Sequence, residues 1–461
     1  MRWNSYRQAF EDTSSDALFL EFFMNASYPR FFKYITLNIT GMLGISCYIL
    51  ADTFFIANGI GSDGLAALNL AIPIYSFIHG FALMLGTGGA TKYLIAKCQG
   101  EHHRANDIFT NGIKIGLIFS GMFIACGLFL TPTLPNLLNA DSALWDMTNI
   151  YLKVILLFSP FFIANEQLLA YVRNDGSPTL PMTAMVCGSI ANNILDYIFI
   201  YPMQMGIFGA ALATGIAPIV SMLILSRHIA RDTCGFRLNR SHIQRKIITD
   251  TMILGFPSLV TEVSAGIVMI VFNLLVMEQA GNVGVAAYGI IANVALVTTS
   301  IFTGLSQGAQ PLISEAYSTD ACQALKKYIH RSILSGMILS LILYIFMYSC
   351  ASPIASIFNR DAHMLLQQLS ENGIILYFTS LPFTAMNLIL CRSFTAVEKP
   401  LPAHIISLLR GIFIIIPLSL MFAKHYGLTG IWLTVTATEC LTAVFAILLW
   451  LTSPATKTPS L

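Results

Sequence analysis

The residues of this sequence best able to do chemistry are a few acidic and amide side chains inside long apolar stretches. Asp52 and Asp196 are two such acids, and Asn192 precedes Asp196 by four residues, which places both on one face of a helix. Thr214 adds a hydroxyl in the next apolar stretch. Two carboxylates, an amide and a hydroxyl are hard oxygen ligands that a sodium ion accepts in place of water. The same group could instead hold a proton, because burial and a neighbouring acid both favour the uncharged form.

Three more ionisable residues, Glu262, Arg410 and Glu439, fall near the middle of later apolar stretches. Buried charges usually persist by pairing, so we expect a structural ion pair between Arg410 and either Glu439 or Glu262. Glu262 is also a candidate for binding a substrate or a proton. Glu166 either pairs with Arg173, about two helical turns further along the chain, or acts directly.

The elements that position these residues must lie largely in lipid. The sequence is 56% hydrophobic and 10% charged, whereas soluble domains carry about 25% charged residues. Its apolar stretches are long enough to cross a bilayer as helices. We predict an all-α polytopic membrane protein with twelve transmembrane helices in two six-helix lobes. The predicted spans are 31–57, 64–96, 107–131, 146–171, 179–201, 206–229, 250–277, 284–313, 327–350, 363–391, 400–422 and 427–451.

The distribution of basic residues predicts the topology, because cytoplasmic loops are enriched in Lys and Arg. With the amino terminus inside, 20 of the 25 basic residues lie in cytoplasmic segments or adjoining helix ends, 2 lie in outer loops and 3 lie within helices. Both termini are therefore assigned to the cytoplasmic side of the plasma (inner) membrane. The predicted parts are a cytoplasmic segment 1–30, an N-lobe 31–230, a cytoplasmic linker 231–249, a C-lobe 250–452 and a cytoplasmic tail 453–461.

An internal duplication relates the two halves. Shifts of 220 or 221 residues place glycines of the first half on glycines of the second: Gly61 on Gly281, Gly64 on Gly284, Gly88 on Gly308, Gly206 on Gly427 and Gly209 on Gly430. Because each half has an even number of spans, both halves enter the membrane in the same direction. We expect a parallel pseudo-two-fold repeat about an axis along the membrane normal.

The duplication does not extend to the acidic cluster of the first half. Shifts of 220 to 222 residues bring Phe272, Leu418 and Val435 to the positions that correspond to Asp52, Asp196 and Thr214. This asymmetry favours a specific site. The structural alternative is that Asp52 caps a helix end and that Asp196 bonds to a neighbour on its own helix, Asn193 or Tyr197.

Several stretches that cover most of the chain in order carry a family likeness. They are ADTFFI at 51–56, GLAALNLAIP at 64–73, YVRNDGSP at 171–178, GFPS at 255–258 and GLSQGAQPLIS at 304–314. The sequence resembles the multidrug and toxic compound extrusion (MATE) family in its bacterial and archaeal branches. The resemblance implies a twelve-helix exporter with two lobes that exchanges amphipathic, often cationic, compounds for inward-moving sodium ions or protons.

The resemblance also bears on individual positions. Family members with a cation site in the N-lobe match Asp52, Asn192, Asp196 and Thr214 in helix and spacing, and Glu262 is similar to an acidic position that some members carry on helix seven. One departure concerns the first helix, where members often have a proline that is thought to bend it. Here Leu37 stands at about that position, and no proline lies between Pro29 and Pro73.

Three classes of function compete. The first is a sodium- or proton-coupled antiporter that exports drugs or toxic organic compounds by alternating access, as a monomer in the lipid bilayer and without a cofactor. The second is a flippase of a lipid-linked precursor in the same superfamily, which would need a basic cavity, whereas only Arg410 lies deep in a span. The third is a membrane enzyme or primary pump, and the sequence has no G-x-x-x-x-G-K-[ST] loop and no H-E-x-x-H helix. A net charge of +2 without a basic stripe indicates no nucleic-acid partner.

Overall fold

The computed structural model describes residues 28–138, 141–359 and 363–452, and these ranges are helical with no strand. The predicted tail 453–461 and the amino-terminal segment up to residue 27 lie outside the described residues. The helices of the first half are α3 (Tyr28–Gly59), α4 (Ser62–Cys98), α5 (His102–Ala125), η1 (Cys126–Leu130), α6 (Leu134–Leu137), α7 (Ser142–Leu157), α8 (Ser159–Asn174), α9 (Thr179–Ile200) and α10 (Gly206–Ile229).

The second half is also all helical, and its longest helices, α11 and α17, each combine two crossings. Its helices are α11 (Arg245–Ser318), α12 (Cys322–Ser349), α13 (Ala351–Phe358), α14 (Met364–Tyr377), η2 (Phe378–Ser380), α15 (Leu381–Ala396), α16 (Pro400–Leu408), η3 (Leu409–Phe413) and α17 (Ile415–Thr452). Because α11 begins at Arg245, the last positions of the predicted linker are helical. The apolar span marks only where a helix meets lipid, and the helix itself continues into the aqueous phase.

The described helices account for the twelve predicted spans. Within the described ranges, nine stretches are long and apolar enough to cross a membrane, and α7 and α8 together form one more span with a bend of 48°. Two of the nine stretches contain a second crossing, because the backbone leaves the helical conformation at Gly281 within α11 and at Gly427 within α17.

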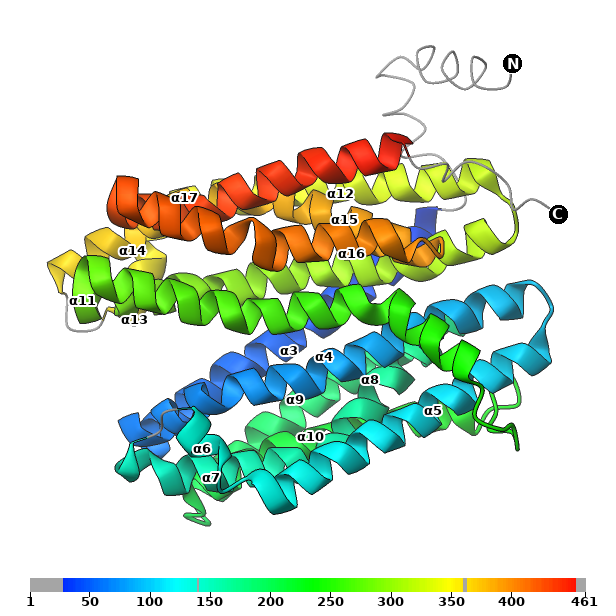
Figure 1. Ribbon diagram of the computed structural model, residues 1–461, viewed down its shortest axis with the longest axis horizontal. Coiled ribbons are helices and arrows are strands. Elements are labelled where there is room, and N and C mark those ends of the chain that lie inside the picture. Colours follow the sequence, from blue (N-terminus) through cyan, green and yellow to red (C-terminus); the bar gives the residue numbers. More distant parts are fainter. Residues whose placement is uncertain (1–27, 139–140, 360–362, 453–461) are drawn as a thin grey trace.

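Figure 1 shows the helices gathered into two bundles, with α3 to α10 in one and α11 to α17 in the other. The α4 helix and the first part of α11 run along each other where the two bundles meet. The segment between α10 and α11, the loop between α4 and α5, and the end of α17 all lie at the right-hand end of the view. This end is the one that the basic residues assign to the cytoplasm.

The internal duplication appears in the backbone at the outer turns. Gly61 and Gly281 have φ values of 100° and 60°, and Gly206 and Gly427 both have 58°. A side chain makes this left-handed conformation costly, so glycine is favoured at all four turns. The glycine pairs that the sequence shift superimposes therefore allow the same left-handed turn in both lobes.

Paired close approaches join the lobes toward the cytoplasmic end. A Cβ atom on Gly88 of α4 would collide with the carbonyl oxygen of Thr251 of α11, and one on Gly255 would collide with that of Met84. At the equivalent crossing, a Cβ on Gly308 would lie 2.7 Å from the carbonyl oxygen of Tyr34 of α3. Glycine is thus needed here so that backbones of the two lobes can touch.

The contact between α4 and α11 loosens toward the outer side. A Cβ atom on Gly80 would meet the end of the Leu259 side chain at 2.8 Å, whereas the nearest atom to a Cβ on Gly266 is the Ser76 hydroxyl at 3.9 Å. From the cytoplasmic end outward, the atom nearest to such a Cβ changes from a backbone oxygen to the end of a side chain and then to a more distant side-chain hydroxyl. The two helices therefore diverge from the cytoplasmic end toward the outer end.

Candidate functional site

The helices α3 and α9 bring Asp52 and Asp196 together by packing in register. Gly41 of α3 lies against Met185 of α9, since a Cβ at Gly41 would be 2.9 Å from the Met185 sulfur. Each acid lies eleven residues further along its own helix, which is about three turns. Because both helices cross the membrane in the same direction, the two acids return to the same interface at the same depth.

The four residues predicted for the N-lobe cluster are all buried. With its amide oriented to satisfy its neighbours, Asn192 donates to Asp196 Oδ2 at 3.0 Å and accepts from the backbone N–H of Thr214 at 3.3 Å. The Thr214 hydroxyl donates to the Ala210 carbonyl at 3.1 Å. Asn192 thus links α9 to α10. It is also the hydrogen-bond partner of Asp196.

Two carboxylate oxygens of the cluster have no hydrogen-bond partner. Oδ1 of Asp52 and Oδ1 of Asp196 are buried and unpartnered, and the two acids lie close enough for their charges to interact. An isolated buried carboxylate is costly, and two adjacent ones repel each other. A cation or a proton between them would remove both penalties, and the oxygen donors present fit either.

Glu439, one of the two C-lobe acids near the middle of a span, is fully paired. Arg410, in the π-helical turn η3, forms an ion pair with Glu439 of α17 at 2.6 Å, and Asn387 of α15 donates to the other carboxylate oxygen at 2.6 Å. Glu439 is therefore the partner of Arg410, and the alternative partner Glu262 lies elsewhere. The positive charge of Arg410 is paired with Glu439, so Arg410 does not provide the basic cavity that a flippase of a lipid-linked precursor would need.

Glu262 lies beside a histidine of the opposite lobe. His79 Nδ1 of α4 is 3.0 Å from Glu262 Oε1 of α11, and His79 Nε2 is 3.9 Å from Glu166 Oε1 of α8. The expected pairing of Glu166 with Arg173 is wrong, because Arg173 donates instead to Gln307 of α11 at 2.7 Å. The two-turn spacing allowed that pair, but the packing of α8 against α11 gave Arg173 a partner in the other lobe.

Sequence reasoning missed the polar contacts that join the lobes near the cytoplasmic end. Arg30 of α3 forms an ion pair with Glu315 of α11 at 2.6 Å, and Lys92 of α4 pairs with Glu398 at 2.9 Å. Gln310 donates to the Thr91 hydroxyl at 2.6 Å. These partners are more than 200 residues apart, so no local pattern could have identified them.

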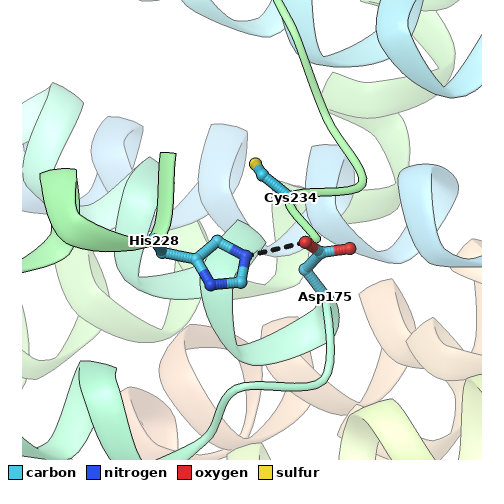
Figure 2. A group of neighbouring side chains, drawn as sticks. All are labelled: Asp175, His228 and Cys234. Atoms are coloured by element: carbon cyan, nitrogen blue, oxygen red, sulfur yellow. Dashed lines mark hydrogen bonds and ion pairs between the residues drawn. The ribbon is translucent and has the colours of Figure 1, made fainter. Parts of the chain in front are cut away.

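Asp175 forms a cluster of a different kind at the cytoplasmic end of the N-lobe. Figure 2 shows His228 pointing at its carboxylate at 2.7 Å, with Cys234 on the adjoining segment. The carboxylate also accepts from Tyr93, Lys97 and the backbone N–H of Gly235. Burial would raise the pKa of Asp175, but these hydrogen bonds outweigh burial and lower the pKa to about 2. With Lys97 on the same carboxylate, the group serves as an anchor for the segment after α10.

The anchored segment continues along α5. The backbone N–H groups of Arg237, Asn239 and Gln244 donate to side chains of α5 at 2.7, 3.1 and 2.9 Å. Phe236 is 1% exposed and packs against a set of N-lobe rings, namely Tyr93, Phe109, Tyr171 and His228. The connection between the lobes is therefore bound to the N-lobe up to the start of α11.

Comparisons with known proteins agree with this architecture. The MatE family model matches residues 39–198 and 257–421, which is one segment in each lobe. The multidrug export protein MepA of Staphylococcus saprophyticus is 26% identical over 406 residues, covering 87% of this chain and 88% of that protein. A solved structure described as the outward-facing conformation of a multidrug resistance MATE family transporter has a TM-score of 0.86 at 21% identity, covering 93% of this chain and 96% of that one.

A second solved structure has the same fold. The crystal structure of MATE in the straight conformation matches with a TM-score of 0.85 at 22% identity, covering 92% of this chain and 96% of that one. In this chain α3 is one continuous helix past Leu37. With a family match in both lobes and a shared twelve-helix fold, this chain is a transporter that belongs to the MATE family.

Proposed function

We propose that this chain is a cation-coupled antiporter that exports amphipathic, mainly cationic, drugs or toxic organic compounds. The observation that carries the coupling is the pair of buried, unpartnered carboxylate oxygens on Asp52 and Asp196. The coupling ion, sodium or a proton, is held there by Asp52, Asn192, Asp196 and Thr214. The substrate class is supported by relatives named as multidrug export proteins.

Transport proceeds by alternating access between the lobes. The divergence of α4 and α11 toward the outer side, with backbones touching near the cytoplasmic end, suits a state that is open outward. Binding of the ion in the N-lobe favours the lobe arrangement from which the substrate leaves. A membrane potential supplies about 2.3 kcal/mol per charge per 100 mV, so inward cation movement can drive export.

The setting of this cycle follows from the distribution of charge. The chain lies in the plasma (inner) membrane with both termini on the cytoplasmic side, as the 20 basic residues of the cytoplasmic segments support. It works as a monomer, with a small organic molecule and the lipid bilayer as its partners. It needs no cofactor other than the coupling ion.

The proposal is tested in inverted membrane vesicles whose membranes contain the wild-type protein or the Asp196→Asn variant. Uptake of a fluorescent organic cation is followed under an imposed sodium gradient and then under a proton gradient. We expect Asp196→Asn to abolish gradient-driven uptake, and the gradient that drives the wild type identifies the ion. Asp63→Asn, which alters an exposed acid at the outer start of α4, should behave as the wild type. Normal uptake by Asp196→Asn would refute the site.

A further inference from the structure

The imidazole of His79 lies between two carboxylates that come from both lobes. Glu262 of the C-lobe is 3.0 Å from Nδ1, and Glu166 of the N-lobe is 3.9 Å from Nε2. The two acids thus share one imidazole, which is cationic when protonated, in contrast to Asp52 and Asp196, which share no basic group among the described residues. Charges buried in a membrane protein persist by such pairing.

The position of the cluster makes it reachable from the space between the lobes. His79 and Glu262 lie near the middle of their spans, one residue from the Gly80 contact with Leu259 in the case of His79. Outward from this point α4 and α11 diverge. The side chains of His79, Glu166 and Glu262 are 24%, 16% and 32% exposed, so each carries surface that a ligand can touch.

The contact between His79 and Glu262 is one from which a competing cation could displace the imidazole. Although Nδ1 is 3.0 Å from the carboxylate oxygen, it is not aligned for a hydrogen bond and has no other partner. The contact is therefore mainly an attraction between charges, which any other cation at the same place can supply. Tyr75 stacks on the imidazole, with ring centroids 5.8 Å apart and planes 9° apart, so a cation that displaced the imidazole would meet this ring face.

We propose that His79 is an internal counter-ion whose place beside Glu262 and Glu166 is taken by the positive charge of the transported compound. This inference rests on the proposed export of organic cations and adds the residue that sets their affinity. Without a cationic substrate, the imidazolium offsets one of the two negative charges and attracts both carboxylates across the lobe interface. A cationic substrate must displace the imidazolium, so His79 lowers the affinity of the site for every cation. The site then favours the cations that are attracted most strongly to the two carboxylates.

The test measures equilibrium binding of tetraphenylphosphonium, a permanent cation, to the purified protein in lipid nanodiscs at about pH 6, where an ordinary histidine is mostly protonated. We expect His79→Gln to bind the cation about tenfold more tightly and His79→Arg about tenfold more weakly, since tenfold corresponds to one modest charge contact. Glu262→Gln should weaken binding. Glu278→Gln, an exposed acid further along α11, should leave it unchanged.

A neutral probe of similar shape, triphenylphosphine oxide, separates charge from packing. Its affinity should be the same in the wild type, His79→Gln and His79→Arg, whereas a merely structural role for His79 would weaken both probes in both variants. Equal tetraphenylphosphonium affinity in the two His79 variants, or no binding to the wild type, would overturn the inference. Binding at equilibrium needs no gradient, so a failure of ion coupling in the Asp196→Asn vesicles would leave this result standing.

Discussion

Glu439 of the C-lobe and the Asp52–Asp196 pair of the N-lobe are buried acids in opposite surroundings. In the C-lobe, Glu439 has Arg410 on one oxygen and Asn387 on the other. In the N-lobe, Asp52 and Asp196 lie near each other, and each has a buried oxygen without a partner. The two lobes nevertheless share left-handed glycines at their outer turns. The difference therefore lies in the partners of the buried acids and not in these turns.

The comparison teaches that two buried acids can differ completely in their partners. Glu439 and Asp196 are both buried within helices. A buried acid with partners has its charge compensated in the folded protein, whereas an unpaired one leaves a free-energy penalty. In the proposed coupling, an ion or a proton bound between Asp52 and Asp196 would relieve this penalty.

The largest expected effect tests the paired acid. Glu439→Leu leaves Arg410 as an uncompensated buried charge, which should cost about 3–5 kcal/mol of stability. Thermal unfolding of the detergent-solubilised protein measures the loss. The double variant Arg410→Met with Glu439→Leu should recover most of the stability, because it removes both charges. A stable single variant would show that the ion pair is not structural.

The unpaired acids should behave in the opposite way. Asp196→Asn should leave the unfolding temperature unchanged or raised in the absence of the coupling ion, because it removes a buried charge with an unpartnered oxygen. The wild type should gain about 2.7 kcal/mol when the coupling ion is at 100 times its Kd. The variant should gain none. Thermal unfolding across a sodium series and a pH series checks this, and an equal response in the variant would contradict it.

Asp175 extends the comparison to a saturated acid within the N-lobe. Its folded pKa of about 2 lies below the ordinary value of 3.8, so its stabilisation is fully present above about pH 4 and is lost as the pH falls toward 2. Asp175→Asn at neutral pH should therefore cost about 2 kcal/mol. It should also speed tryptic cleavage of the segment from Arg231 to Arg245, followed by gel electrophoresis. Cleavage at the wild-type rate would mean that the segment is held by other contacts.

The smallest effect concerns the exposed pair between Arg30 and Glu315. Both side chains are substantially exposed, at 50% and 37%, and such pairs contribute about 0–1 kcal/mol. Arg30→Gln should therefore change the stability by less than 1 kcal/mol. A double-mutant cycle with Glu315→Gln measures the coupling directly. A coupling as large as that of the Arg410 pair would remove the distinction between buried and exposed partners.

The sequence alone was sufficient for the spans, and it indicated which buried polar residues of the N-lobe could lie together. Hydropathy located all twelve helices because lipid leaves a spanning backbone few options other than a helix of about twenty apolar residues. Asp52 and Asp196 stood out as acids because each lies inside a long apolar stretch. Asn192 followed from helical periodicity, since it lies one turn before Asp196.

Only the tertiary structure decided which charged groups meet. Arg410 had two candidate partners at similar depth, and packing gave it Glu439, while Glu262 met His79 from the opposite lobe. Arg173 had a neighbour at a suitable spacing in Glu166, yet it donates to Gln307. An apolar pattern fixes how far each residue lies along its helix, but the rotation of that helix and its neighbours depend on side chains distant in the sequence. The sequence therefore predicted the position of each charged residue along its helix, but not the residue with which it pairs.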